Sequence, residues 1–245
     1  MNEILHHTYT PVPMSKPQDI NIDISSHENI LRKSLYEALL KAIEDINEKL
    51  INKKSLRILD VGSGRGELLS LLSKKGHQVV GIDPNVECVQ LGSQYGQCFQ
   101  GAFEDTMRLF QPEEFDVIVS SHVLEHVLRP IDAMMQLNQL KAKAYIFAVP
   151  NVHRNARLIR LLLGSARPDH PNHIYGWGKP EFEAALRTAG FKVLRWYTNR
   201  VTINPFGSAL LTRILAPLEV KLLPRLFPLL SSSLIVYCEP IENVK

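Results

Sequence analysis

The stretch Arg57–Leu72, which reads RILDVGSGRGELLSLL, decides the fold. It begins with a short apolar run that predicts a buried β-strand over Arg57–Val61, and it ends with a helical pattern over Glu67–Lys75. Three glycines stand between them: Gly62, Gly64 and Gly66. Glycines let the chain turn tightly and let a ligand approach the backbone, while the helix N-terminus offers unpaired N–H groups. Strand, turn and helix in this order predict an α/β domain that binds a ligand at the turn.

The spacing of the glycines argues against a dinucleotide ligand. The dinucleotide fingerprint G-x-G-x-x-G needs its third glycine three places after the second, and Glu67 stands there instead. A carboxylate at the start of the helix would also repel a diphosphate. Asp83, which follows the next apolar run, can accept hydrogen bonds from both hydroxyls of a ribose. We therefore predict a nucleoside-binding site whose ligand has a tail other than a diphosphate, and a nicotinamide oxidoreductase is disfavoured.

The rest of the chain alternates between apolar runs and helical patterns. Strands are predicted over Arg57–Val61, Gln78–Ile82, Gln97–Gln100, Phe115–Ser121, Ala144–Val149, Lys192–Tyr197 and Leu234–Cys238. Helices are predicted over 30–46 with Ser26 as the N-cap, and over Glu67–Lys75, Val86–Tyr95, Pro130–Leu140 and Lys179–Ala189. Seven strands separated by helices predict a Rossmann-like, doubly wound, mostly parallel sheet.

Two long segments interrupt this alternation. Residues 152–178 contain several His and Arg, and residues 203–230 are apolar, basic and broken by prolines. Segments of this length inside a compact domain are usually lids or binding loops. We divide the chain into an N-terminal arm and helix (1–55) and a ligand-binding domain (56–245) with these two insertions, the second of them lid-like.

Composition excludes several classes of protein. A net charge of +3 without a long Lys/Arg run does not predict nucleic-acid binding. The longest uncharged apolar stretch, Leu226–Cys238, is too short and too interrupted to cross a bilayer, so no transmembrane segment is expected. The three cysteines form no CxxC pair and the N-terminus has no signal-peptide pattern, which predicts a cytoplasmic protein.

Several motifs follow one another in an order typical of one enzyme family. They are DVGSGRG (60–66), GID (81–83), FDVIV (115–119), LEHV (124–127), AVPN (148–151) and EFEAALRTAGFKVL (181–194). Together they resemble class I S-adenosylmethionine-dependent methyltransferases over Leu56–Leu194. The resemblance implies S-adenosyl-L-methionine as cofactor, with the glycine turn on its methionine part and Asp83 on its ribose. The implied cofactor-binding residues are Asp60, Gly62, Ser63, Gly64, Gly66, Asp83, Pro84, Phe103, Glu104 and Ser121.

The adenine end departs from the family pattern. Members often carry an Asp at the second position of the loop that reads GAFED (101–105) here, and this chain has Ala102. The adenine amine would then be read by the backbone near Phe103 or by the Glu104 carboxylate.

The acceptor is expected to be a small molecule that is methylated on oxygen. Methyltransferases of base amines carry an Asn/Asp-Pro-Pro-Tyr/Phe loop where this chain has SSHV (120–123), and no cysteine follows a proline as the cytosine C5 type requires. His122 is the titratable side chain expected to face the methyl group. Neutral imidazole can take a proton from a hydroxyl, so His122 is the predicted base, and His173 is a second predicted catalytic residue.

A metal-dependent reaction is the alternative. Ubiquinone-biosynthesis O-methyltransferases and small-RNA 2′-O-methyltransferases also resemble this chain through Glu-x-x-Glu-His and a later His. In the small-RNA family these four residues bind a divalent metal. The matching positions are His122, Glu125, His126 and either His173 or His170. We prefer a structural role for Glu125 and His126, which would fix the helix start. The same set could also bind a transition metal.

The segment 203–230 has more than one use. Its leucines recur at helical spacing beside Arg213, Lys221 and Arg225. It can pack over the sheet edge, form a homodimer contact, or contact a membrane surface or lipid-like substrate. A further alternative is an inactive methyltransferase-like subunit that binds a partner, and the intact turn and Asp83 argue against it.

Overall fold

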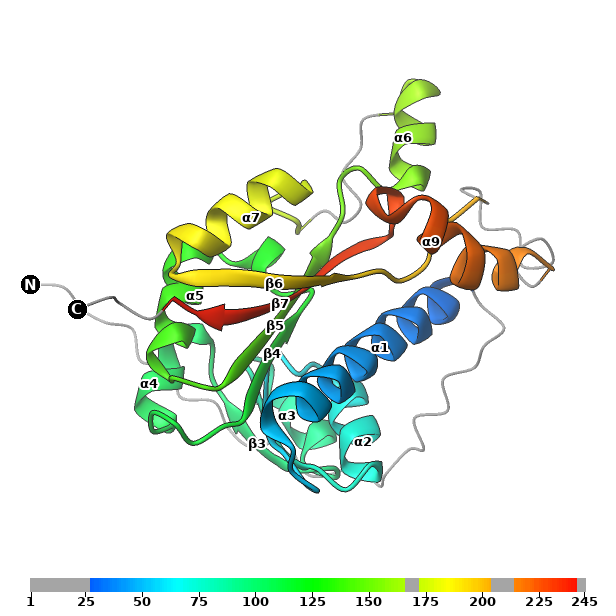
Figure 1. The fold of residues 1–245 in the computed structure, drawn as a ribbon. Helices are drawn as coiled ribbons and strands as arrows, with labels where there is room; N and C mark the ends of the chain where they lie inside the picture. Colours follow the sequence, from blue (N-terminus) through cyan, green and yellow to red (C-terminus); the bar gives the residue numbers. More distant parts are fainter. Residues whose placement is uncertain (1–26, 166–171, 204–213, 242–245) are drawn as a thin grey trace, which may run out of the picture.

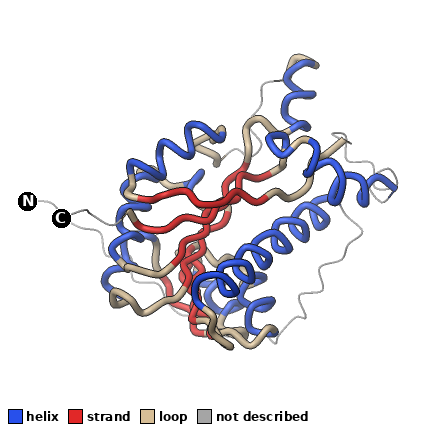
Figure 2. Tube along the Cα trace, viewed as in Figure 1, coloured by secondary structure: helices blue, strands red, loops and turns tan. Residues whose placement is uncertain are grey.

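A computed structural model describes residues 27–165, 172–203 and 214–241, with side chains described from Arg32 onward. Ser26, His170, most of the predicted arm and parts of both insertions lie outside these residues. The described chain forms one sheet between two layers of helices (Figures 1 and 2).

The sheet has seven strands in the order β3-β2-β1-β4-β5-β7-β6. Their bounds are β1 (Arg57–Val61), β2 (Gln78–Asp83), β3 (Gln97–Gln100), β4 (Val117–Ser121), β5 (Ala144–Pro150), β6 (Phe191–Tyr197) and β7 (Ser233–Pro240). β7 runs antiparallel to both neighbours, and the other pairs are parallel. The predicted Rossmann-like, mostly parallel sheet is confirmed.

Helices cover both faces of the sheet. They are α1 (His27–Ile46), α2 (Glu67–Lys74), α3 (Val86–Gly92), α4 (Thr106–Leu109), α5 (Pro130–Gln139), α6 (Asn155–Leu162), α7 (Lys179–Thr188) and α9 (Leu223–Leu226). Shorter helical turns are η1 (Asn47–Ile51), η2 (Phe103–Asp105), η3 (Leu124–His126), η4 (Leu218–Leu222) and η5 (Pro228–Leu230). Figure 1 shows α1, α2 and α3 on one side of the sheet and α4, α5 and α7 on the other.

Successive side chains of the central strands point to opposite faces of the sheet and so contribute to two apolar cores, one on each face. In β4, Val117 and Val119 join the apolar cluster under α1 and α2, whereas Ile118 between them joins the cluster under α5 and α7. This is the period of two expected of a strand that is buried on both faces. Leu39 and Ile43 bury the apolar side of α1 in the first cluster, so the N-terminal helix covers the sheet of the ligand-binding domain.

The first insertion contains a helix, α6, that the sequence patterns did not predict, and the described part of the second is helical, as its leucine spacing indicated. α6 lies in 152–178, buries none of its residues, and projects away from the sheet (Figure 1). The chain before α6 contacts the segment that follows α9, because Asn151 Nδ2 donates to the Leu229 carbonyl at 2.8 Å. The described part of 203–230 forms η4, α9 and η5. Of the described helices, none is long and apolar enough to cross a membrane.

Candidate active site

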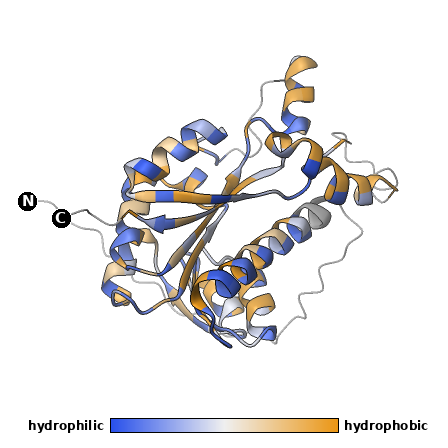
Figure 3. Ribbon diagram, viewed as in Figure 1, coloured by the Kyte–Doolittle hydropathy of each residue, from blue (hydrophilic) through white to orange (hydrophobic). Residues whose placement is uncertain are grey.

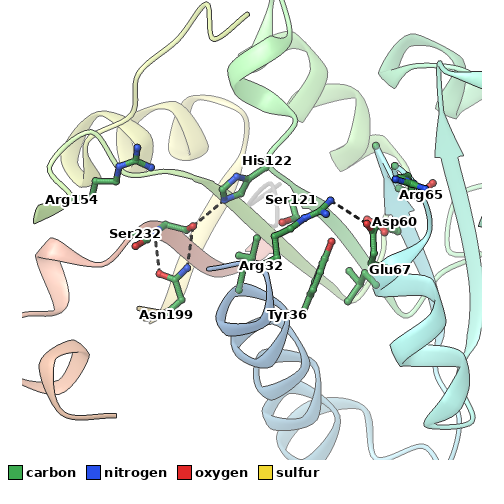
Figure 4. Close-up of a pocket in the computed structure, with 16 residues that line it drawn as sticks. Arg32, Tyr36, Asp60, Arg65, Glu67, Ser121, His122, Arg154, Asn199 and Ser232 are labelled. Carbon is green, nitrogen blue, oxygen red and sulfur yellow. Dashed lines mark hydrogen bonds and ion pairs between the residues drawn. The ribbon is translucent and has the colours of Figure 1, made fainter. Parts of the chain in front are cut away.

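A cavity of about 470 Å³ opens at the carboxyl ends of β1 and β4. These two strands are where the strand order reverses, which is the usual ligand position in open α/β sheets. Figure 4 shows its walls: the glycine turn and Asp60, the end of β4, one side of α1, and the segments around Arg154, Asn199 and Ser232. The sequence predicted the first two of these walls.

The glycine turn has the backbone that only glycine adopts without strain. Gly62, Gly64 and Gly66 have φ of +77°, +54° and +84°. A Cβ on Gly62 would come within 2.2 Å of Val123 Cγ2, whereas a Cβ on Gly64 would meet nothing within 4 Å. The backbone at Gly64 is therefore open to a ligand.

Asp83 holds this turn in place. Its Oδ2 accepts the N–H of Gly64 at 2.8 Å, and its Oδ1 accepts the N–H of Asn85 at 2.9 Å. Each carboxylate oxygen keeps a lone pair for a further donor such as a ribose hydroxyl. Asp83 lies beside the cavity and does not line it, and Pro84 follows it outside the lining.

Asp60 and Ser63 both line the cavity, with different environments. Burial of Asp60, together with the charges of Asp83 and Glu67, raises the pKa of its carboxyl to about 7. The Ser63 hydroxyl is turned toward β2, because its Oγ lies 2.8 Å from the position of a Cβ on Gly81. Ser63 thus lines the cavity, but its hydroxyl points away from the cavity toward β2.

The predicted adenine side lies outside the cavity lining. Phe103 is buried in the apolar core and Glu104 is exposed. Their loop is nevertheless joined to the site, since the N–H of Gly101 donates to the carbonyl of Asp83 at 3.1 Å. The roles of Pro84, Phe103 and Glu104 stay predictions.

His122 and Ser121 form the cavity wall at the end of β4. His122 has φ of +57°, a strained value for a residue with a side chain. Its Nε2 lies 2.9 Å from Ser233 Oγ, and its Nδ1 lies 3.8 Å from Glu125 Oε1. Its side chain keeps 36% exposure.

The His122 imidazole is neutral at neutral pH. Burial, followed by the charges of Arg154 and His173, lowers its pKa to about 4. The direction of this shift is enough to leave the ring uncharged. An uncharged ring at the end of β4 can accept a proton.

His173 lies away from the cavity lining and beside His126. One ligand atom each from Glu125, His126 and His173 lies within 4.8 Å of the other two. Glu125 is 1% exposed, and neither carboxylate oxygen has a hydrogen-bond partner among the described residues. Burial raises its pKa to about 7. The structure thus groups three of the four residues of the metal alternative, and His122 contacts them through Glu125.

The sequence patterns missed the residues that complete the cavity. Arg32 and Tyr36 reach it from α1, and the Arg32 Nη2 lies 3.1 Å from Glu67 Oε1. Arg154 precedes α6, Asn199 follows β6, and Ser233 is the first residue of β7. The last pair has no local sequence signal: in the antiparallel register Tyr197 faces Ile235, and this pairing brings Asn199 and Ser233 together two residues further.

Comparison with known proteins agrees with this geometry. A family model described as "Methyltransferase domain" matches residues 31–195. The ubiquinone biosynthesis O-methyltransferase of Glaesserella parasuis serovar 5 (strain SH0165) is 25% identical over 161 residues, which cover 62% of this chain and 66% of that protein. The corresponding protein of Bradyrhizobium sp. (strain ORS 278) is 36% identical over 86 residues, covering 33% and 34% of the two chains. The chain spans about a third to two thirds of the length of these relatives.

Solved structures share the fold. The magnesium protoporphyrin IX methyltransferase ChlM of Synechocystis PCC 6803, solved with bound SAH, aligns with a TM-score of 0.60 at 14% identity, covering 86% of this chain and 85% of its own. The family model covers well over half of the chain, and the strand order, glycine turn and cavity position agree with it. The chain therefore belongs to the methyltransferase-domain family and has the fold of class I S-adenosylmethionine-dependent methyltransferases.

Proposed function

We propose that this methyltransferase transfers the methyl group of S-adenosyl-L-methionine to an oxygen of a small-molecule acceptor. The observation that carries the proposal is the place of the His122 imidazole in the cavity lining at the end of β4. The ring stands in the cavity wall between the glycine turn and the polar wall of Asn199 and Ser233 (Figure 4).

The turn side of the cavity suits the methionine part of the donor. That part carries an ammonium, a carboxylate and a sulfonium. Asp60 offers a buried carboxyl for the cationic groups, and Arg32 offers a cation for the carboxylate. Asp83 beside the turn has lone pairs for the ribose hydroxyls. These charges support a zwitterionic ligand better than a diphosphate.

The opposite side suits a hydroxyl acceptor. In the reaction the acceptor oxygen forms a bond to the methyl carbon while the carbon–sulfur bond breaks and its electron pair stays on sulfur. The acceptor's proton must leave, and His122 is the base that takes it. Alignment of oxygen, carbon and sulfur by the cavity supplies a large part of the rate. The relatives described above are ubiquinone biosynthesis O-methyltransferases, which supports oxygen as the acceptor atom.

An apolar and basic surface beside the cavity supports a lipid-like acceptor. Leu161, Leu162 and Leu163 at the end of α6 are 57%, 86% and 66% exposed. Leu226 and Phe227 in the neighbouring segment are also exposed, and Figure 3 shows both segments as hydrophobic. Arg157, Arg160, Lys221 and Arg225 lie on the same elements. An apolar surface with basic residues suits an anionic membrane surface that delivers the acceptor.

A metal-dependent reaction is the second candidate. Glu125, His126 and His173 are grouped, and the buried Glu125 carboxylate has no hydrogen-bond partner among the described residues; both features fit a transition metal. These three residues would hold the ion, which would supply Lewis-acid activation of an acceptor oxygen. Metal analysis of protein purified without chelator, with Glu125→Gln and His126→Ala as variants, tests this candidate.

The cellular setting is part of the proposal. All three cysteines, Cys88, Cys98 and Cys238, are free thiols, which supports a reducing compartment such as the cytoplasm. A homodimer through 203–230 is the alternative use of the apolar surface.

Methyl transfer from labelled S-adenosylmethionine to a panel of catechols, phenols and amines tests the proposed reaction. We expect transfer to hydroxyl acceptors, and a loss of about 100-fold in kcat for His122→Asn. His77→Asn is the control, because His77 accepts the N–H of Leu56 at the opposite end of β1. Transfer to amines alone, or full activity of His122→Asn, would contradict the proposal.

A further inference from the structure

A cluster of buried polar residues joins His122 to the paired ends of β6 and β7. Asn199, Ser231 and Ser233 are 5%, 1% and 3% exposed. Ser233 contacts the His122 ring, Asn199 lines the same cavity (Figure 4), and Ser231 lies behind them against Asn199. A buried polar group costs free energy unless it is hydrogen-bonded, so each of these groups is expected to have a partner. The donor and acceptor in each pair then indicate where the hydroxyl protons lie.

The orientation of the Asn199 amide follows from its neighbours. Its Oδ1 lies 3.0 Å from the backbone N of Ser233, which can only donate. The same Oδ1 accepts from Ser231 Oγ at 2.8 Å, and Ser231 Oγ accepts the backbone N–H of Asn199 at 2.9 Å. The NH₂ of Asn199 must therefore be the group that faces Ser233 Oγ, at 3.2 Å.

This orientation directs the hydroxyl proton of Ser233. Ser233 Oγ accepts from Asn199, so its own proton is available to donate. In the described part of the chain, His122 Nε2 lies 2.9 Å from this hydroxyl and is an acceptor within its reach. When Ser233 donates to it, Nε2 carries the lone pair and the ring proton is on Nδ1, which faces Glu125 Oε1 at 3.8 Å.

An imidazole nitrogen has one lone pair in the ring plane, and Ser233 occupies that of Nε2. A proton that reaches Nε2 must come from the Ser233 hydroxyl. Ser233 itself lines the cavity, so an acceptor hydroxyl can donate to its Oγ. We propose that Ser233 relays the acceptor's proton to His122, and that Asn199 is the residue that positions the Ser233 hydroxyl. This inference rests on the proposed methyl transfer to oxygen.

The relay balances as follows. The acceptor oxygen gains the methyl group, and the carbon–sulfur bond of the donor breaks with its electron pair left on sulfur. The acceptor O–H bond breaks and its proton forms a new O–H bond on Ser233. The original Ser233 proton moves to Nε2, so His122 ends as an imidazolium and Ser233 is unchanged. A strained φ of +57° at His122 is consistent with a ring held for this contact.

Nitrogen NMR of the His122 side chain in the full chain, saturated with S-adenosylhomocysteine, tests the inference without the acceptor. We expect Nδ1 with a proton and Nε2 without one in the wild type. Ser233→Ala should shift the ring toward the Nε2–H form, and Ser233→Thr should restore the wild-type signal. Ser232→Ala is the matched control, because Ser232 also lines the cavity while its Oγ donates to the carbonyl of Arg200.

Kinetics with an acceptor found in the labelled panel add a second readout. Ser233→Ala should lower kcat about 100-fold with little change in KM for S-adenosylmethionine, and Ser233→Thr should recover most of the loss. A wild-type ring with its proton on Nε2, or a Ser233→Ala variant with wild-type kcat, would overturn the relay. A wild-type protein that does not bind S-adenosylhomocysteine would contradict the proposed function itself. A protein that binds it but gives either of the results above would contradict only the relay.

Discussion

At the residue scale, Gly62 is expected to tolerate substitution less well than Gly64. Its φ of +77° costs an ordinary residue about 1–2 kcal/mol, and a Cβ would also overlap Val123 Cγ2 at 2.2 Å. Gly64 shares the positive φ but has open space around it. We expect Gly62→Ala to lower the free energy of unfolding by about 3 kcal/mol and Gly64→Ala by about 1 kcal/mol. Urea unfolding of both variants measures the difference, and equal losses would contradict the contact with Val123.

Asp60 makes stability depend on pH. Its pKa is about 7 in the folded chain, against about 3.9 in the unfolded chain. The folded state therefore binds more protons between these values, and stability falls as pH rises through this window. The cost is fully present above pH 7 and amounts to about 4 kcal/mol.

Replacing this carboxyl with an amide removes the ionisation cost. Without ligand, Asp60→Asn should be more stable than the wild type by roughly 2 kcal/mol at pH 8, since the amide must still be buried. The gain should shrink as the pH falls toward 4. Urea unfolding across this range checks the sign. A variant that is less stable than the wild type at pH 8 would show that the Asp60 charge is compensated in the folded chain.

At the scale of elements, a buried ion pair fixes the η4–α9 segment to the end of β6. Arg200 and Glu219 are both fully buried, with Arg200 Nε 2.7 Å from Glu219 Oε2. The other carboxylate oxygen, Oε1, accepts the N–H of Ile203 at 2.6 Å. The pair thus ties a segment of an insertion to the stretch after β6 that contains Asn199.

Breaking this pair should be costly because one charge would stay buried. We expect Glu219→Gln to destabilise the protein by about 3–5 kcal/mol, and the double variant Arg200→Met, Glu219→Leu to recover most of that loss. Glu44→Gln is the control, since the Lys75–Glu44 pair is about half exposed and should contribute under about 1 kcal/mol. Thermal unfolding compares the three. Equal losses for the buried and exposed pairs would contradict the account of the segment's attachment.

The apolar surface of α6 and α9 makes a prediction about membranes. Full-length protein should co-sediment with vesicles that contain anionic lipid, and less so with neutral vesicles. Leu162→Ser with Leu226→Ser should reduce binding several-fold. Leu128→Ser is the control, because Leu128 is 77% exposed beside α5. Binding that is absent, together with a dimer that these substitutions dissociate, would assign the surface to self-association instead.

At the scale of the whole molecule, the sheet was predictable and much of the cavity was not. β1, β2, β4 and β5 are near-continuous apolar runs, and such runs are a local signal for buried parallel strands. The glycine turn was also local, since strand, glycines and helix adjoin in sequence. Both features can therefore be predicted from the local sequence, without knowledge of tertiary contacts.

The missed residues depend on contacts between distant segments. Arg32 and Tyr36 sit on an ordinary amphipathic helix, and only its position over the sheet brings them to the cavity. Asn199 and Ser233 meet because β6 and β7 pair antiparallel. α6 was missed because it buries none of its residues, so no core constrains its pattern. His173 was expected at the substrate, and it lies beside His126 instead of in the cavity lining, with its role untested.

The measurement that tests the central claim most directly is calorimetric titration of the full-length protein with S-adenosylmethionine, S-adenosylhomocysteine and NAD. We predict one site for each of the first two ligands and none for NAD. We also predict that Asp83→Ala weakens S-adenosylhomocysteine by at least about tenfold, or about 1.4 kcal/mol. An absence of heat with both S-adenosyl ligands, or an Asp83→Ala variant with unchanged affinity, would contradict the assignment of this cavity as the methyl-donor site.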